Sequence, residues 1–430
     1  MENKTSVRLL ALKSLVRCEK EKRFANLEIN ALLSKTSLTS ADKKLYTALV
    51  YGVIEKEMML DYIIAPYIKG EISRLDREVQ TALRLGALQM FFFEKIPDYS
   101  VINETVEAVK SAGVRSASGL VNAVLRALAK NKAEICDKIK SAPMSVRYSM
   151  PEWIIDIYKS SYGEEKALEI LEGFNTRPPI TLHTNTLKIS TDTLLARLLE
   201  DGFKAHVSEL HEDIIVLDTG CAEDITGFDE GLFFVQGIPS ALCIKNLSPN
   251  PDAILVDTCA CPGGKSFASA VQMKNRGKIY SFDIHSSKLS LITSGAERLG
   301  ISIIETGERD AREDNSALFG KCDFVVVDAP CSGLGVISKK PDIRRKSYDD
   351  IKRLPEIQYD ILKSASKLLK VGGRLLYSTC TLNKLENEDV TDKFLESCEG
   401  FERLSGFPKT YFPTEETGDG FFCDILTRTK

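Results

Sequence analysis

The stretch that decides the fold is Ala253-Ile254-Leu255-Val256-Asp257-Thr258-Cys259-Ala260-Cys261-Pro262-Gly263-Gly264-Lys265. Its first five residues are typical of a buried strand, its glycines of a tight turn, and the residues after them of a helix. Glycine lets a ligand approach the backbone closely, and a helix N-terminus attracts a negatively charged group. We therefore expect this turn to bind a small ligand that carries an anionic group.

The alternation of strand, turn and helix continues on the C-terminal side of this stretch. Apolar strand candidates recur at residues 278–283, 301–305, 324–328 and 374–378, and a helix is expected at residues 286–299. Strands that alternate with helices form a parallel sheet covered on both faces, and ligands bind where such strands end. The sequence thus predicts an α/β Rossmann-like domain with its site at the carboxyl edge of the sheet.

The turn lacks the spacing of the two common nucleotide motifs. It is neither G-x-G-x-x-G nor G-x-x-x-x-G-K-[ST], which disfavours a dinucleotide and a P-loop nucleotide. S-adenosylmethionine fits better, because its carboxylate would meet the helix N-terminus and Asp283, at the end of the second strand, could accept its ribose hydroxyls. Asp310, after the third strand, could reach the adenine amino group. The alternative is a plain tight turn with two ordinary surface acids.

Two cysteines follow adjacent strands of the expected sheet. Cys331 lies in Asp328-Ala329-Pro330-Cys331-Ser332-Gly333, and Cys380 lies in Tyr377-Ser378-Thr379-Cys380-Thr381. A single cysteine is most often a small buried hydrophobe, but two beside one methyl donor indicate chemistry. Carbon 5 of cytosine is a poor nucleophile, and a thiolate that adds to carbon 6 turns the ring into an enamine whose carbon 5 can attack a methyl group. Asp328 is placed to stabilise the charge that develops on the ring.

The rest of the chain predicts two further domains. Residues 1–140 show helical spacing, with a break at residues 98–101 before a helix at residues 102–111, and indicate an all-α bundle. Residues 141–233 indicate a small α+β domain. Its expected elements are strands at residues 180–185, 205–207 and 214–217 around a helix at residues 191–200. The α/β domain would then occupy residues 234–430.

Composition and charge narrow the class of protein. Residues 1–140 carry 23 Lys and Arg against 17 Asp and Glu, whereas residues 141–430 carry 34 against 44, so a polyanion is a candidate partner for the first segment. The eleven cysteines come without an apolar signal segment or a span of bilayer length, which favours reduced thiols in a cytoplasmic protein that contacts no membrane. Cys259 and Cys261 have no second pair or His-x-x-x-His run to complete a zinc site, so we expect no metal.

The motifs together resemble those of the RNA cytosine-C5 methyltransferases, in particular the bacterial small-subunit rRNA enzymes of the Sun/RsmB type. The resemblance rests on residues 259–265, 328–333 and 378–381 and spans nearly the whole chain. The segments Leu45-Tyr46-Thr47-Ala48-Leu49-Val50-Tyr51-Gly52 and Val121-Asn122-Ala123-Val124-Leu125-Arg126 look like the NusB-type RNA-binding domain of this subgroup. Asp419-Gly420-Phe421-Phe422 resembles its C-terminal strand signature.

The resemblance implies a fold, a reaction and a set of residues. It implies a NusB-like bundle, a ferredoxin-like RNA-contacting domain and a class I methyltransferase domain in a monomer that methylates carbon 5 of a cytosine in 16S rRNA. It implies that Cys380 is the nucleophile and that Cys331 assists release of the product. The S-adenosylmethionine pocket would be lined by Cys259, Ala260, Cys261, Pro262, Gly263, Gly264, Lys265, Asp283, Asp310 and Asp328.

Some positions depart from the pattern, and two other interpretations stay open. Cys261 stands where the family usually has alanine, and Gly237 where it usually has aspartate. The basic cluster at residues 339–346 matches only partly and is our candidate for phosphate contacts. One alternative is a non-catalytic assembly or antitermination factor that holds RNA. Another is a cytosine methyltransferase for a different nucleic acid, in which Cys331 of the Pro-Cys pair is the nucleophile, as in DNA enzymes.

Overall fold

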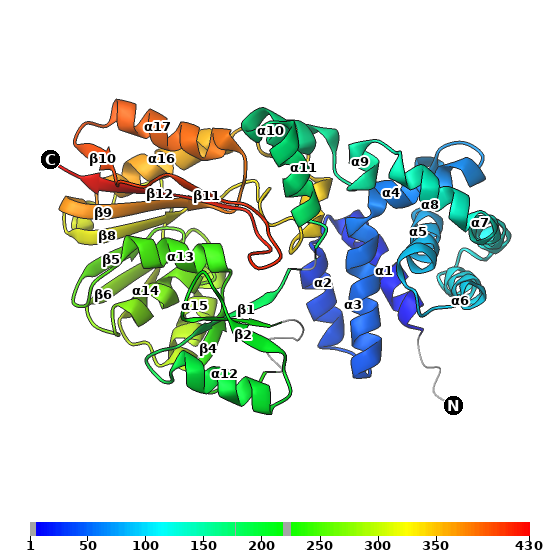
Figure 1. Ribbon diagram of the computed structural model, residues 1–430, viewed down its shortest axis with the longest axis horizontal. Helices are drawn as coiled ribbons and strands as arrows, with labels where there is room; N and C mark the ends of the chain where they lie inside the picture. The colour runs from blue at the N-terminus through cyan, green and yellow to red at the C-terminus, as the bar shows by residue number, and fades with distance from the viewer. Residues whose placement is uncertain (1–5, 177, 218–224) are drawn as a thin grey trace. The chain divides into compact units, whose positions relative to one another are not determined.

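The computed structural model describes residues 6–176, 178–217 and 225–430 and divides the chain into two compact units (Figure 1). The first unit comprises Met1–Asp156 and Lys340–Lys346, and the second comprises Ile157–Lys339 and Ser347–Lys430. Within the described residues, no helix is both long and apolar enough to cross a membrane.

The first unit is built from helices, as the sequence predicts. They are α1 (Val7–Glu21), α2 (Ala25–Leu33), α3 (Ser40–Glu55), α4 (Glu57–Ile64), α5 (Arg77–Phe92), α6 (Asp98–Ser111), α7 (Ser118–Lys130), α8 (Lys132–Lys140) and α9 (Met144–Arg147), with short 3₁₀ turns between some of them.

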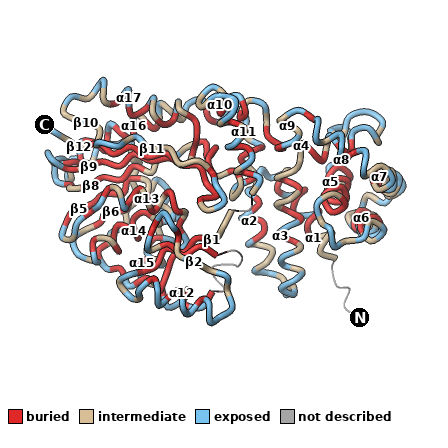
Figure 2. Tube along the Cα trace, viewed as in Figure 1, coloured by how far each residue is buried: buried red, intermediate tan, exposed pale blue. Residues whose placement is uncertain are grey.

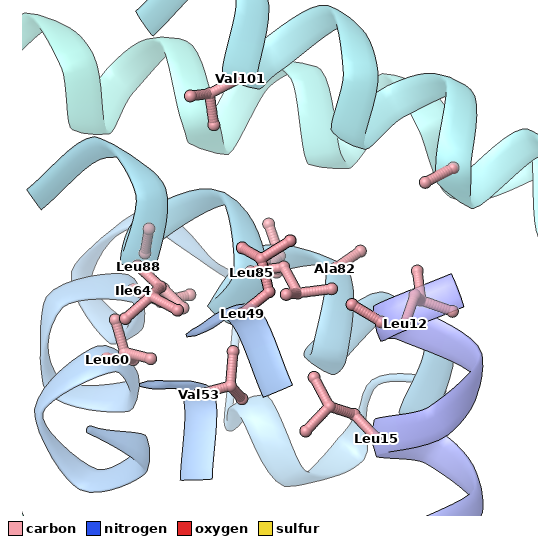
Figure 3. Packing of buried hydrophobic residues seen from close by; sticks show 14 of the residues in the cluster. Leu12, Leu15, Leu49, Val53, Leu60, Ile64, Ala82, Leu85, Leu88 and Val101 are labelled. Carbon is pink, nitrogen blue, oxygen red and sulfur yellow. The ribbon is translucent and has the colours of Figure 1, made fainter. Parts of the chain in front are cut away.

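Apolar side chains from most of these helices meet in one core (Figure 3). Leu12 and Leu15 of α1 lie there with Leu49 of α3 and Leu85 of α5. The core needs close helix packing, because a Cβ added at Gly86 of α5 would lie 2.5 Å from a methyl carbon of Leu125.

The predicted break at residues 98–101 is wrong. Helix α6 begins at Asp98, directly after Pro97, which caps its N-terminus. The apolar pattern did not show this first turn, because Tyr99 is 71% exposed and does not face the core. The acidic Asp98 stabilises the turn, since it lies at the positive end of the helix dipole.

The second unit begins with a small α+β part. Helices α10 (Glu152–Tyr162, which starts in the first unit) and α11 (Glu164–Gly173) precede an antiparallel sheet of order β2-β3-β1-β4. Its strands are β1 (Ile180–Thr184), β2 (Ala205–Val207), β3 (Ile214–Leu217) and β4 (Phe233–Val235), and its helix is α12 (Thr191–Glu200). The α+β prediction is confirmed, whereas the expected division after residue 233 falls inside β4, which pairs with β1.

The larger sheet has the order β10-β12-β9-β8-β5-β6-β7, with β11 on β12. Neighbours from β9 to β7 run parallel, and β10, β11 and β12 add antiparallel pairs, so the predicted α/β fold with a mostly parallel sheet is confirmed. The strands are β5 (Ile254–Asp257), β6 (Lys278–Asp283), β7 (Ile304–Glu308), β8 (Cys322–Asp328), β9 (Leu369–Thr379), β10 (Phe401–Arg403), β11 (Lys409–Tyr411) and β12 (Phe421–Arg428).

Helices cover both faces of this sheet, and its strands β5, β8, β9 and β12 are largely buried (Figures 1 and 2). Alternate residues enter two different cores: Leu376 of β9 packs in the core that α13, α14 and α15 share, and its neighbours Leu375 and Tyr377 pack with α16 and α17. The helices are α13 (Ile238–Leu247), α14 (Gly264–Gln272), α15 (Ser286–Leu299), α16 (Leu354–Ser366) and α17 (Glu388–Ser397).

Candidate active site

The glycine turn lies at the topological switch point of the larger sheet. Strand β5 has β8 on one side and β6 on the other, and the turn leads from β5 into α14. Gly263 caps α14 with a φ of 113°, and a Cβ there would lie 2.6 Å from the ring of Phe267. The turn therefore requires glycine at this position and presents a helix N-terminus at the edge where α/β sheets bind ligands.

Asp283 ends β6 beside this turn. Its carboxylate accepts hydrogen bonds from the backbone N–H of Cys261 at 3.2 Å and of His285 at 2.9 Å. Each carboxylate oxygen keeps a second lone pair, so Asp283 can fix the turn and still accept hydroxyl groups of a ligand. The donor set fits S-adenosylmethionine: a helix N-terminus for its carboxylate and Asp283 for its ribose.

Asp257 lies beneath the turn and holds it from inside. Its side chain is 1% exposed and accepts a hydrogen bond from Ser266 Oγ at 2.7 Å, and Ser266 Oγ lies 2.8 Å from Ser281 Oγ on β6. Burial raises the pKa of Asp257 to about 7. This buried polar chain joins β5, α14 and β6 below the cofactor turn.

Lys265 joins the cofactor turn to the end of β8. Its side chain is only 6% exposed, and its ammonium group lies 2.7 Å from Asp328 Oδ2 and 4.8 Å from the centre of the Phe421 ring. Burial lowers the pKa of Lys265, but the Asp328 carboxylate and its neighbours raise it by more, so Lys265 stays charged. Ser378 Oγ of β9 donates to Asp328 Oδ1 at 2.9 Å, which leaves Asp328 oriented by two strands and one helix.

The two cysteines meet where β8 and β9 end. Cys331 Sγ and Cys380 Sγ are 3.3 Å apart, and both side chains are half-buried. Gly335 N–H donates to the carbonyl of Cys380 at 2.9 Å, and a Cβ on Gly335 would lie 2.0 Å from the carbonyl oxygen of Gly420. The loop after Cys331 is thereby packed against the residue that carries the second thiol.

Burial helps to raise the pKa of three cysteine thiols of the site. The hydrogen bond with Cys380 and burial raise the pKa of Cys331, and the nearby charge of Glu386 adds to this effect, so Cys331 stays a thiol. Burial also raises the pKa of Cys259, and that of Cys261 to about 12. Cys259 and Cys261 therefore lie in the cofactor turn as protonated thiols.

Asp310 lies in the loop after β7 and binds Arg312. Its carboxylate accepts hydrogen bonds from the Arg312 backbone and guanidinium at about 3.0 Å, and the hydrogen bond with the Arg312 side chain lowers its pKa. A small pocket nearby is lined by Thr258, Phe282 and Ala311, among others. The expected contact between Asp310 and the adenine amino group stays a prediction.

The sequence of the whole chain matches that of a known bacterial protein. It is 36% identical, over 93% of this chain and 90% of the relative, to the Bacillus subtilis (strain 168) protein named Probable ribosomal RNA small subunit methyltransferase B. The chain belongs to the RsmB/F family of 16S rRNA methyltransferases. A relative of the same name in Synechocystis sp. is 30% identical over 92% of this chain and 90% of its own length.

Family models match the three parts of this RsmB/F family member. The NusB family matches residues 5–130, the RsmF/B-like ferredoxin-like domain residues 150–224, and the 16S rRNA methyltransferase RsmB/F model residues 244–427. The crystal structure of PH0851 is similar to the chain with a TM-score of 0.82 at 25% identity, covering 98% of each chain. A methyltransferase homologue from Pyrococcus horikoshii covers 66% of this chain and 97% of its own, with a TM-score of 0.59 and 27% identity.

Sequence reasoning missed the polar residues beneath the two thiols. Glu386 and Asn387 are 0% exposed although they lie in the polar run Asn383-Lys384-Leu385-Glu386-Asn387, and Gln358 of α16 is also fully buried. The signal was present, because a run of acid and amide residues directly after a reactive turn has either to face solvent or to bind backbone groups. Only the structure shows that it binds backbone groups.

The basic cluster at residues 339–346 is largely engaged in contacts within the protein. Lys339 Nζ binds Asp419 Oδ2 at 2.5 Å, and Asp419 lies where a side chain on Gly237 would point, 3.0 Å from its Cβ. Arg345 binds Glu57 of the first unit at 2.8 Å, and Arg344 is 8% exposed. These contacts weaken the prediction that the whole cluster binds phosphate. Within the described ranges, no group of three or more His, Cys, Asp or Glu side chains could hold a metal ion.

Proposed function

We propose that this protein transfers a methyl group from S-adenosylmethionine to carbon 5 of a cytosine in 16S rRNA, through a covalent bond between Cys380 and carbon 6 of the base. The observation that carries the proposal is the pair of thiols 3.3 Å apart beside the Lys265–Asp328 ion pair. Membership of the RsmB/F family and the names of its relatives support 16S rRNA as the substrate.

Each of these side chains has a defined task in the proposed reaction. The Cys380 thiolate adds to carbon 6, and the electrons of the carbon 5–carbon 6 bond move into an enamine. The Lys265 ammonium, which the Asp328 carboxylate holds in place, stabilises the negative charge that develops on the ring. The bound cofactor supplies an electrophilic methyl group, which the enamine carbon attacks.

The second half of the reaction releases the enzyme. Removal of the proton on carbon 5 returns an electron pair to the ring, re-forms the double bond and expels Cys380 as a thiolate. Water takes this proton, and the Cys331 thiol, within contact distance of Cys380, assists release by donating a hydrogen bond to the departing thiolate. A cytosine must leave its base stack to reach either thiol, so unpaired RNA should react best.

The experiment is direct detection of the methylated nucleoside. Unmodified 16S rRNA, naked or in 30S particles, is incubated with the protein and methyl-labelled S-adenosylmethionine, digested, and analysed by mass spectrometry. We expect label in 5-methylcytidine. Label in a base methylated on nitrogen would refute the carbon-5 assignment, and RNA binding without any label would support the non-catalytic alternative.

A further inference from the structure

A buried carboxylate lies behind the two thiols. Glu386 is 0% exposed and accepts hydrogen bonds from the Ser332 backbone N–H at 2.8 Å, from Gln358 Nε2 at 3.0 Å and from Asn383 Nδ2 at 3.0 Å. All three of these donors are neutral groups. Burying a negative charge among neutral donors is costly, which indicates that this position serves more than packing.

The hydrogen bonds of Glu386 hold the Cys331 turn on both sides of the cysteine. Ser332 follows Cys331, and Gln358, which also binds Glu386, donates to the carbonyl of Pro330, the residue before Cys331, at 3.0 Å. The backbone of the Cys331 turn is therefore fixed by one carboxylate and one amide.

The same network reaches the Cys380 turn. Ser332 Oγ lies 2.7 Å from Thr381 Oγ1, next to Cys380 in the chain, and Asn387 Nδ2 donates to the Thr381 carbonyl at 3.0 Å. Asn383, which binds Glu386, also has its backbone N–H 3.3 Å from Thr381 Oγ1. Both thiols are thus held from below by one buried polar network centred on Glu386.

The charge of Glu386 also acts on the Cys331 thiol. The titratable groups that interact with Cys331 are Cys380 at the end of β9, Tyr377 of β9 and Glu386 of the following loop. Of these, Cys380 and Glu386 both act to keep Cys331 protonated. A negative charge next to a thiol raises its pKa, so the Glu386 carboxylate favours the thiol form of Cys331.

We propose that Glu386 is a positioning residue of the reaction: it sets the Cys331 turn against Cys380 and holds Cys331 in the thiol form. The inference rests on the proposed function for its catalytic meaning. The effect of Glu386 on the position and reactivity of the two thiols can be tested without RNA and without methyl transfer.

The test is the rate at which iodoacetamide alkylates each cysteine of the full chain between pH 6 and pH 10, read from peptides by mass spectrometry. In the native protein we expect Cys380 to react before Cys331. In Glu386→Gln, which keeps the shape and removes the charge, the Cys331 profile should move to lower pH by about one pH unit, and the Cys380 to Cys331 rate ratio should fall several-fold. An unchanged profile and ratio in folded Glu386→Gln would overturn the proposal.

Two further variants separate charge, position and fold. Asp424→Asn removes another fully buried carboxylate, which lies on β12 and binds Arg403 of β10, and should leave the alkylation ratio unchanged. Glu386→Asp keeps the charge but draws it back from Ser332, so it should keep the alkylation profile and still lower kcat at unchanged cofactor affinity. Wild-type kcat in Glu386→Asp would refute the positioning role, even if Glu386→Gln failed to fold.

The alkylation experiment tests the role of Glu386 separately from the methylation experiment, which tests the proposed function. If the alkylation profile shifts as expected but the native protein forms no 5-methylcytidine, the arrangement of the thiols stands and the reaction is wrong. If 5-methylcytidine forms and the profile does not shift, the reaction stands and the role of Glu386 is wrong.

Discussion

The sequence identified single residues of the site, but not the contacts between them. Lys265 and Asp328 both lie in motifs that the sequence shows, but their 2.7 Å ion pair joins the first turn of α14 to the end of β8, which only the fold brings together. The same holds for Glu386, because the polar run that contains it does not show that it binds the Ser332 backbone and the Gln358 side chain of α16.

Asp283 gives the clearest residue-scale prediction. We expect Asp283→Ala to weaken S-adenosylmethionine binding by about 1.5–3 kcal/mol, the range for loss of hydrogen bonds to a charged group. Titration calorimetry measures this, with Glu305→Ala as the matched control, because Glu305 is an exposed carboxylate of β7 that pairs with Lys278. Equal affinity of Asp283→Ala and the native protein would remove Asp283 from the site.

At the scale of elements, the prediction succeeded where burial alone decides the pattern. Helix α12 and strands β2, β3 and β6 have the predicted bounds. Strand β7 begins at Ile304 rather than at residue 301, because Ile301 and Ile303 are buried before the chain pairs with β6 at Ile279. Apolar residues indicate which positions are buried, whereas the register of a strand depends on the strand it pairs with. The sequence analysis missed β4 and the antiparallel strands β10 and β11 for the same reason.

The stability of the small sheet should depend on pH through His183 of β1. This side chain is 5% exposed, lies 2.7 Å from Gln236 Oε1 and stacks on Phe234. Burial lowers its pKa from 6.5 to about 4, so the unfolded chain takes up a proton in this interval and the folded chain does not. The stability that neutral His183 contributes is present above pH 6.5 and is lost as the pH falls towards 4, by at most about 3 kcal/mol.

The measurement compares urea unfolding of the native protein and His183→Phe between pH 4 and pH 7. The comparison is needed because Asp257, with its pKa raised to about 7, has the opposite trend and costs stability as the pH rises through the same interval. The native protein should lose stability relative to the variant as the pH falls. A constant difference across this interval would mean that His183 titrates normally.

At the scale of the whole molecule, the helical unit is larger than the segment predicted from helical spacing. It includes α9 and residues 340–346, where Asp342 accepts a hydrogen bond from the Ala25 N–H at 3.2 Å. Sequence patterns could not show this, because residues 340–346 lie about 200 positions after the last helix of the unit. The NusB and methyltransferase parts were recognisable from their motifs, and the ferredoxin-like part was expected only from the resemblance to the family.

We expect the helical unit to contribute RNA affinity and no chemistry. Deletion of residues 1–140, which carry an excess of six positive charges, should raise the RNA concentration needed for half-maximal methylation and leave cofactor binding intact. The affinity that the segment adds should fall steeply with salt, because it depends on phosphate contacts. Filter binding at several salt concentrations measures it, and equal RNA affinity with and without the segment at every salt would contradict the role.

The central claim is that Cys380 attacks the base and Cys331 releases it, and a denaturing gel tests it most directly. Cys380→Ala, Cys331→Ala and a control, Cys398→Ala at the end of α17, are incubated with 16S rRNA and S-adenosylmethionine. We predict a slowly migrating protein–RNA adduct that accumulates in Cys331→Ala, no adduct and no turnover in Cys380→Ala, and native behaviour in Cys398→Ala. An adduct that survives in Cys380→Ala and is absent from Cys331→Ala would exchange the two roles, and native turnover in both variants would contradict covalent catalysis.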